Sequence, residues 1–275
     1  MTETDYVLDS ASTLGRQQLS CLETLYDGLT EQFLVEVGVG AGSRCLDIGA
    51  GAGSISQWLA QRVGPDGRVV AVDIAADHLT GTANLSVVRH DINDGVPDGG
   101  PYDLIHARLV LMHLPRREEL LRMLVDALRP GGRLVIGEAE EYGTRPTEVL
   151  SARSSTDVQV FNRVVNATIN TVGRAAGIDY EWVHRLGGAL VDAGLDEVRA
   201  SAFRSTTAGG LAGAALNANY VRQVQSLVLD AGVTEQELSR FYELSSDPEF
   251  RTWAMPLTYF TGRKPQARAS DSADD

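Results

Sequence analysis

The sequence predicts an α/β fold with a doubly wound, mostly parallel sheet, and three observations support this. Residues 44–48 form an apolar strand that runs directly into the glycine-rich turn Gly49-Ala-Gly-Ala-Gly53, and a helix follows over residues 54–62. Residues 68–73 form a second apolar strand that ends in an acid. Strand-like and helix-like segments then alternate as far as residue 136, which is typical of a parallel sheet with crossover helices.

The glycine turn indicates which ligand this unit binds. Glycines at 49, 51 and 53 remove the Cβ atoms that would keep a bound molecule at a distance. A dinucleotide site requires G-x-G-x-x-G, but Ser56 occupies the position of the third glycine, and no Lys-Ser/Thr pair follows. Asp73 lies about twenty residues beyond the glycines, where a carboxylate accepts both ribose hydroxyls. The pattern therefore favours a nucleoside without a 2′-phosphate.

Four successive motifs resemble those of the class I S-adenosylmethionine-dependent methyltransferases. The resemblance covers residues 43–137 and rests on LDIGAGAG at 46–53, VVAVD at 69–73, HDIND at 90–94, and YDLIHARLVLMHLP at 102–115 followed by LRPGGRLVI. It implies a Rossmann-like fold with a seven-stranded, mostly parallel sheet, an antiparallel edge strand and helical lid insertions. It also implies S-adenosyl-L-methionine as the cofactor.

The same resemblance assigns cofactor contacts by position. The methionine part would face Asp47, Gly49, Ala50, Gly51 and Gly53, the ribose would contact Asp73 with Ile74, and the adenine would border Asp91 with Ile92.

Two residues of the N-terminal segment are further candidates for contact with the cofactor. Arg16 is a candidate partner for the cofactor carboxylate, and Tyr6 could close the site. Each position has a plainer interpretation: Arg16 as a surface arginine, Tyr6 as a packing residue, and Asp91 as the cap of the turn at 93–95.

Four side chains are candidates for a catalytic role. Arg108 and His113 follow the fourth predicted strand, beneath the sulfonium or beside the acceptor in the resembled family. Glu138 and Glu140 follow the fifth strand, where an acid could orient an amine or act as a base. A hydrogen-bonding histidine that fixes a turn and a solvated glutamate loop explain these residues equally well.

The amino-acid composition limits the kinds of partner that the protein is expected to bind. A formal charge of −13 argues against nucleic acid and anionic membrane surfaces, which both require a basic patch. The acidic N-terminus predicts no signal peptide, and no apolar stretch is long enough to span a bilayer. Two cysteines, Cys21 and Cys45, fit a reducing cytoplasm. The sequence shows no spacing of metal ligands, so no metal is expected.

The expected organisation divides the chain into seven segments. These are a helical extension over 1–40 that is broken near Gly28, a core over 41–140, a lid insertion over 141–180, more core over 181–205, a second insertion over 206–250, a final strand over 251–264 and a disordered tail over 265–275. The two insertions could meet over the carboxyl ends of the strands and enclose a small acceptor. They could also build a homodimer.

The function expected from the sequence is methylation of a small-molecule acceptor on nitrogen, oxygen or carbon, with secondary metabolism as a candidate setting. The alternative is an enzyme of the same fold that binds this cofactor and catalyses a cyclisation or decarboxylation, because a fold does not fix a reaction. A nicotinamide-dependent oxidoreductase is disfavoured by the glycine spacing.

Overall fold

A seven-stranded sheet forms the centre of the computed structural model, which describes residues 12–143 and 145–266. The strands lie in the order β3-β2-β1-β4-β5-β10-β7, and the pairs from β3 through β5 are all parallel. Their bounds are β1 Arg44–Ile48, β2 Arg68–Asp73, β3 Leu85–Arg89, β4 Tyr102–Arg108, β5 Leu128–Ala139, β7 Asp196–Phe203 and β10 Leu257–Arg263. The predicted α/β fold with seven strands is confirmed.

The antiparallel strand is β10, but it lies one place in from the edge that the sequence predicted for it. It pairs antiparallel with β5 on one side and with β7 on the other. Burial explains the order: β10 is almost entirely buried, whereas β7 is mostly exposed and begins with Asp196 and Glu197. A polar strand is tolerated at an edge, where one side of the ladder faces water.

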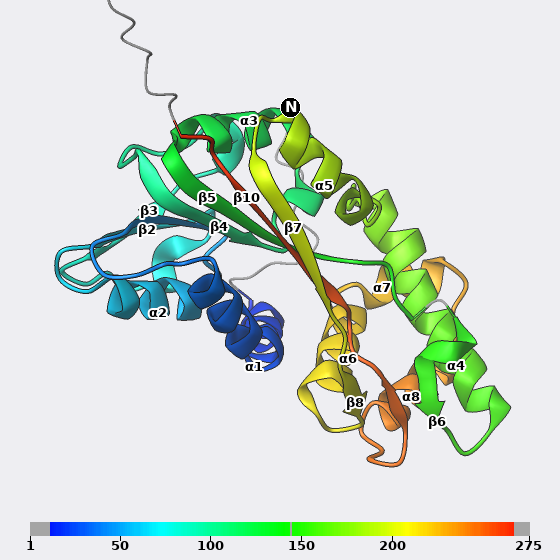
Figure 1. The fold of residues 1–275 in the computed structure, drawn as a ribbon. Helices are drawn as coiled ribbons and strands as arrows, with labels where there is room; N and C mark the ends of the chain where they lie inside the picture. Colours follow the sequence, from blue (N-terminus) through cyan, green and yellow to red (C-terminus); the bar gives the residue numbers. More distant parts are fainter. Residues whose placement is uncertain (1–11, 144, 267–275) are drawn as a thin grey trace, which may run out of the picture.

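Helices cover both faces of the sheet. Figure 1 shows α1 (Thr13–Glu36) and α2 (Ser54–Val63) on one side, and α3 (Arg117–Ala127) and α5 (Trp182–Asp192) on the other. In α2 the buried residues Ile55, Leu59 and Val63 recur every fourth position, so one stripe of the helix packs on the strands.

The predicted break in the N-terminal helix near Gly28 is wrong, because α1 is continuous through it. A glycine inside a helix costs only about 1 kcal/mol. The buried side chains of Tyr26 and Phe33 on either side keep helical spacing and outweigh that cost.

The strand β5 includes the proline and glycines of the LRPGGRLVI motif. Arg129-Pro-Gly-Gly132 would suit a turn by residue type, but these residues belong to the strand, and a register shift in its pairing with β4 accommodates them.

A second group of elements extends beyond one end of the sheet, and we call residues 146–173 and 206–253 the cap. It contains the helices α4 (Ser155–Asn166), α6 (Ala212–Gln223), α7 (Gln225–Asp230) and α8 (Glu235–Leu244), and a π-helix over Ala167–Gly173. A small antiparallel sheet, in the order β6-β9-β8, joins Val149–Ser151, Arg251–Trp253 and Thr206–Ala208. These strands were not predicted, because three residues are too few for an alternating pattern.

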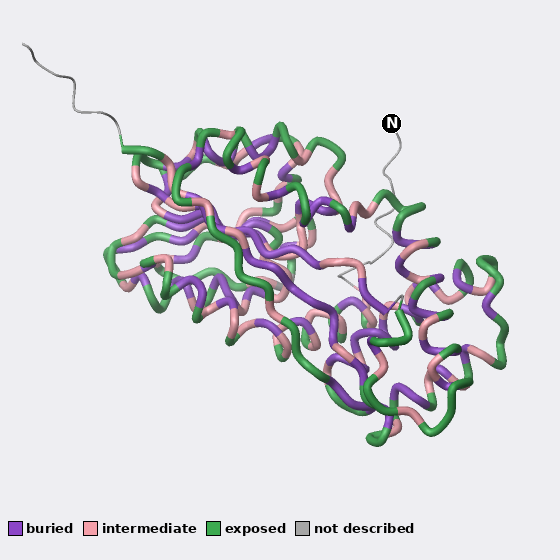
Figure 2. The backbone as a smooth tube through the Cα atoms, turned by 45° about the vertical axis from the view of Figure 1, so that its right-hand side comes forward, coloured by how far each residue is buried: buried purple, intermediate pink, exposed green. Residues whose placement is uncertain are grey.

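The core runs from the sheet into the cap. Figure 2 shows buried backbone along the central strands and on the inner sides of the cap helices, with exposed residues outside. The cap helix α6 packs against α1, so the cap contacts the N-terminal helix as well as the strands. Short 3₁₀ turns fill the loops at Ala76–His78, Ile92–Asp94, Leu111–His113 and Pro146–Glu148. Within the described ranges, no helix has the length and apolar content needed to cross a bilayer.

Candidate functional site

The glycine turn leaves β1 in a conformation that suits only glycine. Gly49 has φ +65° and Gly53 has φ +88°, in the left-handed region. A Cβ atom at Gly53 would also lie 2.8 Å from Cδ2 of Leu79. The N–H groups of Gly49 and Ala50 donate to the Val72 carbonyl at 2.8 and 3.1 Å, which pins the turn to the end of β2.

Asp73 joins this turn to the loop after β2. One carboxylate oxygen accepts from the Gly51 N–H at 2.9 Å, and the other accepts from the Ala75 N–H at 2.9 Å. Asp73 is only half-buried, and the neighbouring Ile74 has 51% of its surface exposed. Gly49 and Asp91 are exposed too, so these four predicted cofactor residues have accessible surface near the carboxyl ends of β1, β2 and β3.

Asp91 caps a turn in this structure. Its Oδ1 accepts from the backbone N–H of Asn93 at 2.9 Å and from the Asn93 side-chain amide at 3.0 Å, and Ile92 beside it is buried. Asp91 therefore caps the turn, as the plainer of its two interpretations predicted. The adenine contact stays a prediction, because a carboxylate has further lone pairs to offer.

Asp47 lies beneath the turn instead of on its surface. Its two oxygens are bonded within the protein: Ser56 Oγ donates to Oδ2 at 2.5 Å, and His106 Nδ1 lies 2.7 Å from Oδ1. All three side chains are almost fully buried. Ser56, which stands where a dinucleotide site has its third glycine, thus anchors the acid that starts the glycine motif.

Arg108 ties the end of β4 to α1. Its guanidinium lies 2.9 Å from the carboxylate of Asp27 and donates to Thr30 Oγ1 at 2.8 Å. The Thr30 hydroxyl donates to the Tyr26 carbonyl, so the Tyr259 hydroxyl at 2.5 Å donates to Thr30. Burial alone would lower the pKa of Arg108, but Tyr259 and Asp27 raise it above its ordinary value. The predicted catalytic or cofactor residue thus holds two elements together.

The turn after β4 is fixed from both sides. Oε1 of Glu138, a fully buried side chain of β5, accepts from the N–H groups of Leu111 at 2.9 Å and Met112 at 3.3 Å. Arg117 donates to the carbonyls of the same two residues at 3.0 and 3.3 Å. Burial raises the pKa of Glu138 to about 8, although these N–H groups and Arg117 oppose the shift. Glu138 is therefore protonated at neutral pH.

His113 ends this turn. Burial and the positive charge of Arg117 lower the pKa of His113 to about 4, so its imidazole is neutral at pH 7. A neutral imidazole has one nitrogen that can accept a proton. The structure thus brings together Glu138, Arg117 and His113 around one short turn.

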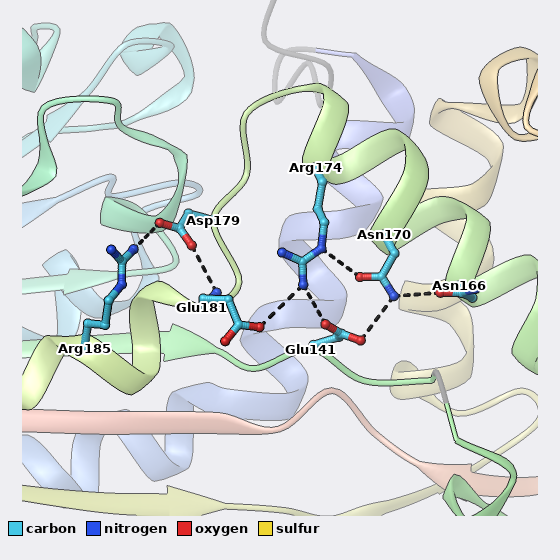
Figure 3. A network of polar contacts seen from close by, with 7 residues as sticks. All are labelled: Glu141, Asn166, Asn170, Arg174, Asp179, Glu181 and Arg185. Carbon is cyan, nitrogen blue, oxygen red and sulfur yellow. Dashed lines mark hydrogen bonds and ion pairs between the residues drawn. The ribbon is translucent and has the colours of Figure 1, made fainter.

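Glu140 and Glu141 lie where β5 leaves the core. Glu140 accepts from the Thr258 hydroxyl at 2.8 Å. Figure 3 shows Glu141 between the π-helix and the segment before α5: it accepts from Arg174 at 2.6 Å and from Asn170 at 3.1 Å, and Arg174 also reaches Glu181. This network ties the end of β5 to the cap.

The last two candidates, Arg16 and Tyr6, belong to the N-terminal segment. Arg16 is an exposed residue in the first turn of α1, and its guanidinium donates to Thr13 at 3.3 Å. Tyr6 lies outside the described residues. On the same helix, Leu19 lies 3.0 Å from the position that a Cβ atom of Gly51 would take, so α1 covers the glycine turn.

Several residues of the site were not predicted. Asp27, Thr30 and Tyr259 complete the Arg108 contacts, and Arg117 holds the turn after β4. Asp27 and Thr30 belong to the same helical face as Tyr26, which the sequence could have shown once that face was assigned to the sheet. Tyr259 and Arg117 carry no local signal, because their contacts depend on the order of the strands.

Comparisons with known proteins agree with this arrangement. A family profile described as a methyltransferase domain matches residues 23–180, more than half of the chain. The methyltransferase GfsG of Streptomyces halstedii is 31% identical over 124 residues, which cover 42% of this chain and 45% of that protein. The ubiquinone/menaquinone biosynthesis C-methyltransferase UbiE of Pseudomonas paraeruginosa is 31% identical over 121 residues, covering 40% and 47%. The chain thus spans about half the length of the curated relatives it matches.

Solved structures share the fold at low sequence identity. The phosphoethanolamine N-methyltransferase 2 of Haemonchus contortus is 13% identical, with a TM-score of 0.56 over 97% of this chain and 61% of that one. The YcgJ protein of Bacillus subtilis is 13% identical, with a TM-score of 0.51 over 87% of this chain and 98% of that one. Together with the motifs and the strand order, the profile match shows that this chain belongs to the class I S-adenosylmethionine-dependent methyltransferase family.

Proposed function

We propose that this protein transfers the methyl group of S-adenosyl-L-methionine to a small-molecule acceptor. One observation carries the proposal: the glycine turn and Asp73 are joined by the hydrogen bond from Gly51 to Asp73, at the carboxyl ends of two adjacent parallel strands. Ligands of doubly wound sheets bind at that end.

The chemistry of these residues fits the cofactor. Asp73 has lone pairs beyond the two that its backbone partners occupy, which suits a ribose diol. The exposed side chain of Ile74 offers an apolar surface beside it. The packing of the turn requires its glycines, because a side chain at Gly49 or Gly53 would collide with Val110 or Leu79.

The residues of this chain mainly align the reactants. When bound, the cofactor supplies an activated methyl group on its sulfonium. The protein must then hold the acceptor in line and exclude water. His113 is our candidate for orienting the reacting group of the acceptor; its imidazole is neutral at pH 7, and a pKa of about 4 makes it a weak base. Arg108 positions β4 against α1, and Glu140 is a candidate for orienting the acceptor at the rim.

The cap supports a small acceptor. It contacts the segment just after β5, where Tyr142 donates to Asn217 of α6 and lies near the buried Tyr26 and Tyr180. The relatives are named for different acceptors, including a quinone-pathway C-methyltransferase and a wheat protein-L-isoaspartate O-methyltransferase. We therefore propose the small-molecule class from the cap and the acidic charge and leave the acceptor atom open. The proposal includes a cytoplasmic location, supported by Cys21 and Cys45, which are both free thiols.

Calorimetric titration tests the cofactor first. We expect the protein to bind S-adenosylmethionine and S-adenosylhomocysteine but not NAD, and Asp73→Ala to lose that binding. Asp77→Ala is the matched control, because Asp77 is an exposed acid on the next turn that pairs only with Arg89 among the described residues. Binding of NAD, or no binding of either sulfur nucleoside by the wild type, would overturn the proposal.

A screen of acceptors then tests the reaction. Formation of S-adenosylhomocysteine in step with a methylated product supports methyl transfer. Conversion of an acceptor without consumption of S-adenosylmethionine would instead show the cyclase or decarboxylase alternative.

A further inference from the structure

The turn Leu111–His113 depends on a side chain from another strand. The first N–H groups of a helical turn have no partner within the turn. Here the N–H groups of Leu111 and Met112 both donate to Glu138 Oε1. Glu138 comes from β5, 26 residues or more along the chain, so a fully buried carboxyl of one strand caps the turn that follows its neighbour.

The turn Leu111–His113 begins beside the glycine turn and ends at the candidate residue His113 of the proposed site. Just before it, Leu109 adopts φ +57°, which is unfavourable for a residue with a side chain, and Val110 packs directly against Gly49 of the glycine turn. At its end lies His113, whose pKa is lowered by the positive charge of Arg117 as well as by burial. A shift of this turn would therefore move Val110, which packs on the glycine turn, together with His113, the candidate contact to the acceptor.

The second carboxyl oxygen of Glu138, Oε2, distinguishes a role as a neutral cap from a role as a general base. Among the described residues, Oε2 is buried and has no hydrogen-bond partner. An ionised carboxylate in that position would be costly, because a buried charge needs partners on both oxygens. The elevated pKa of Glu138, about 8, agrees with this, so the group at neutral pH is a neutral carboxyl that resembles a glutamine in shape. A general base would need the ionised form.

We propose that Glu138 is a positioning residue: as a neutral cap it fixes the turn Leu111–His113, and through this turn it places Val110 against the cofactor site and His113 toward the acceptor. The inference rests on the proposed function for the identity of the cofactor. It also changes the role of Glu138 from the acid or base predicted from the sequence to a group that acts through the backbone.

The test compares Glu138→Gln with Glu138→Leu. Glutamine keeps an oxygen that accepts from Leu111 and Met112, whereas leucine removes it at similar volume. We expect Glu138→Gln to bind S-adenosylhomocysteine within about threefold of the wild type, and Glu138→Leu to bind about tenfold more weakly or worse, since two buried N–H groups lose their acceptor.

A second readout reports on the turn itself. An NMR titration of the His113 imidazole, assigned with His113→Gln, should show a pKa near 4 in the wild type and in Glu138→Gln. In Glu138→Leu this pKa should rise toward the ordinary value of about 6.5, because the freed turn admits water. A loss of global stability alone would not move it. Asp157→Asn is the control: it alters another buried acid, paired with Arg240 in the cap, and should leave both readouts unchanged.

The outcomes are distinguishable. If Glu138→Gln behaves like Glu138→Leu, the charge of Glu138 is required and the positioning role is wrong. The role is also wrong if Glu138→Leu changes neither readout. If Glu138→Leu does not fold, Arg117→Met loosens the same turn from its carbonyl side and should weaken S-adenosylhomocysteine binding; unchanged binding would contradict the positioning role. The His113 pKa does not report on the turn in this variant, because loss of the Arg117 charge raises it directly. A wild type that binds no S-adenosylhomocysteine contradicts the proposed function, whereas the His113 titration still decides the role of Glu138.

Discussion

Asp47 of β1 and His106 of β4 form a buried pair across adjacent parallel strands, with 2.7 Å between Asp47 Oδ1 and His106 Nδ1. An ionised carboxylate only accepts hydrogen bonds, so Nδ1 carries the proton. The pair fixes the ring of His106, which stacks on Tyr259 at 6.4 Å between ring centroids. Asp47 therefore connects the start of the glycine motif to the neighbouring strands.

We predict that Asp47→Ala lowers the free energy of unfolding by about 2–4 kcal/mol. Two buried groups, the Ser56 hydroxyl and His106 Nδ1, lose their acceptor, and each costs about 1–3 kcal/mol when it is left unpaired. Urea unfolding measures the change. Ser56→Ala is the comparison, since it removes one bond and leaves the His106 pair in place. Equal losses in the two variants would show that the His106 pair contributes nothing.

The ion pair between Arg108 and Asp27 should couple α1 to the sheet. Their side chains are 13% and 18% exposed, so solvent screens the pair less than a surface pair. We predict that Arg108→Met and Asp27→Asn each destabilise the protein by about 1–3 kcal/mol and that the double variant loses less than the sum. A double-mutant cycle in urea gives the coupling free energy. Additive losses would mean that the two residues act independently.

Tyr142 connects the end of β5 to the cap helix α6. Its hydroxyl donates to Asn217 Oδ1 at 2.6 Å, and both residues are buried. Tyr142→Phe should cost about 1–2 kcal/mol, because it leaves a buried amide oxygen without its donor while keeping the ring. Thermal unfolding followed by circular dichroism measures this loss. Tyr242→Phe is a matched control, since its hydroxyl bonds to Gln225 at a less buried position and should cost less.

The local motifs predicted the core of the fold well. The pattern over residues 44–73 is a strand, a glycine turn, a helix and a second strand, and each of these depends on nearby residues, so it could be read from the chain. The position of β10 could not, because it depends on whether a buried or an exposed strand takes the edge. The short strands of the cap leave no periodic signal, and the π-helix looks like a continuation of α4 in its sequence pattern.

The candidate site divides in the same way. Gly51 and Asp73 follow from their motifs, and a hydrogen bond joins them in the structure. The roles of Glu138 and Arg108 depend on partners far along the chain, at Leu111 and at Asp27, so residue type suggested chemistry where the structure shows a structural contact. Buried polar residues at strand ends therefore need their partners identified before a catalytic role is assigned.

The protonation of Glu138 predicts how stability changes with pH. The pKa of Glu138 is raised from about 4.5 to about 8 by burial, so between these values the folded state holds a proton that the unfolded state has released. Stability therefore falls as pH rises through this window, by at most on the order of 1 kcal/mol per pH unit for this group.

Glu138→Gln removes this pH-dependent contribution to the free energy of unfolding. The variant should therefore become more stable relative to the wild type between pH 5 and pH 8, with no further gain above about pH 8. Urea unfolding of both proteins at several pH values isolates the effect, because all other groups cancel in the difference. A constant difference across the range would mean that Glu138 titrates near its ordinary pKa and is ionised at neutral pH. In that case the carboxylate would have to find a partner for Oε2 that the folded chain does not show among its described residues.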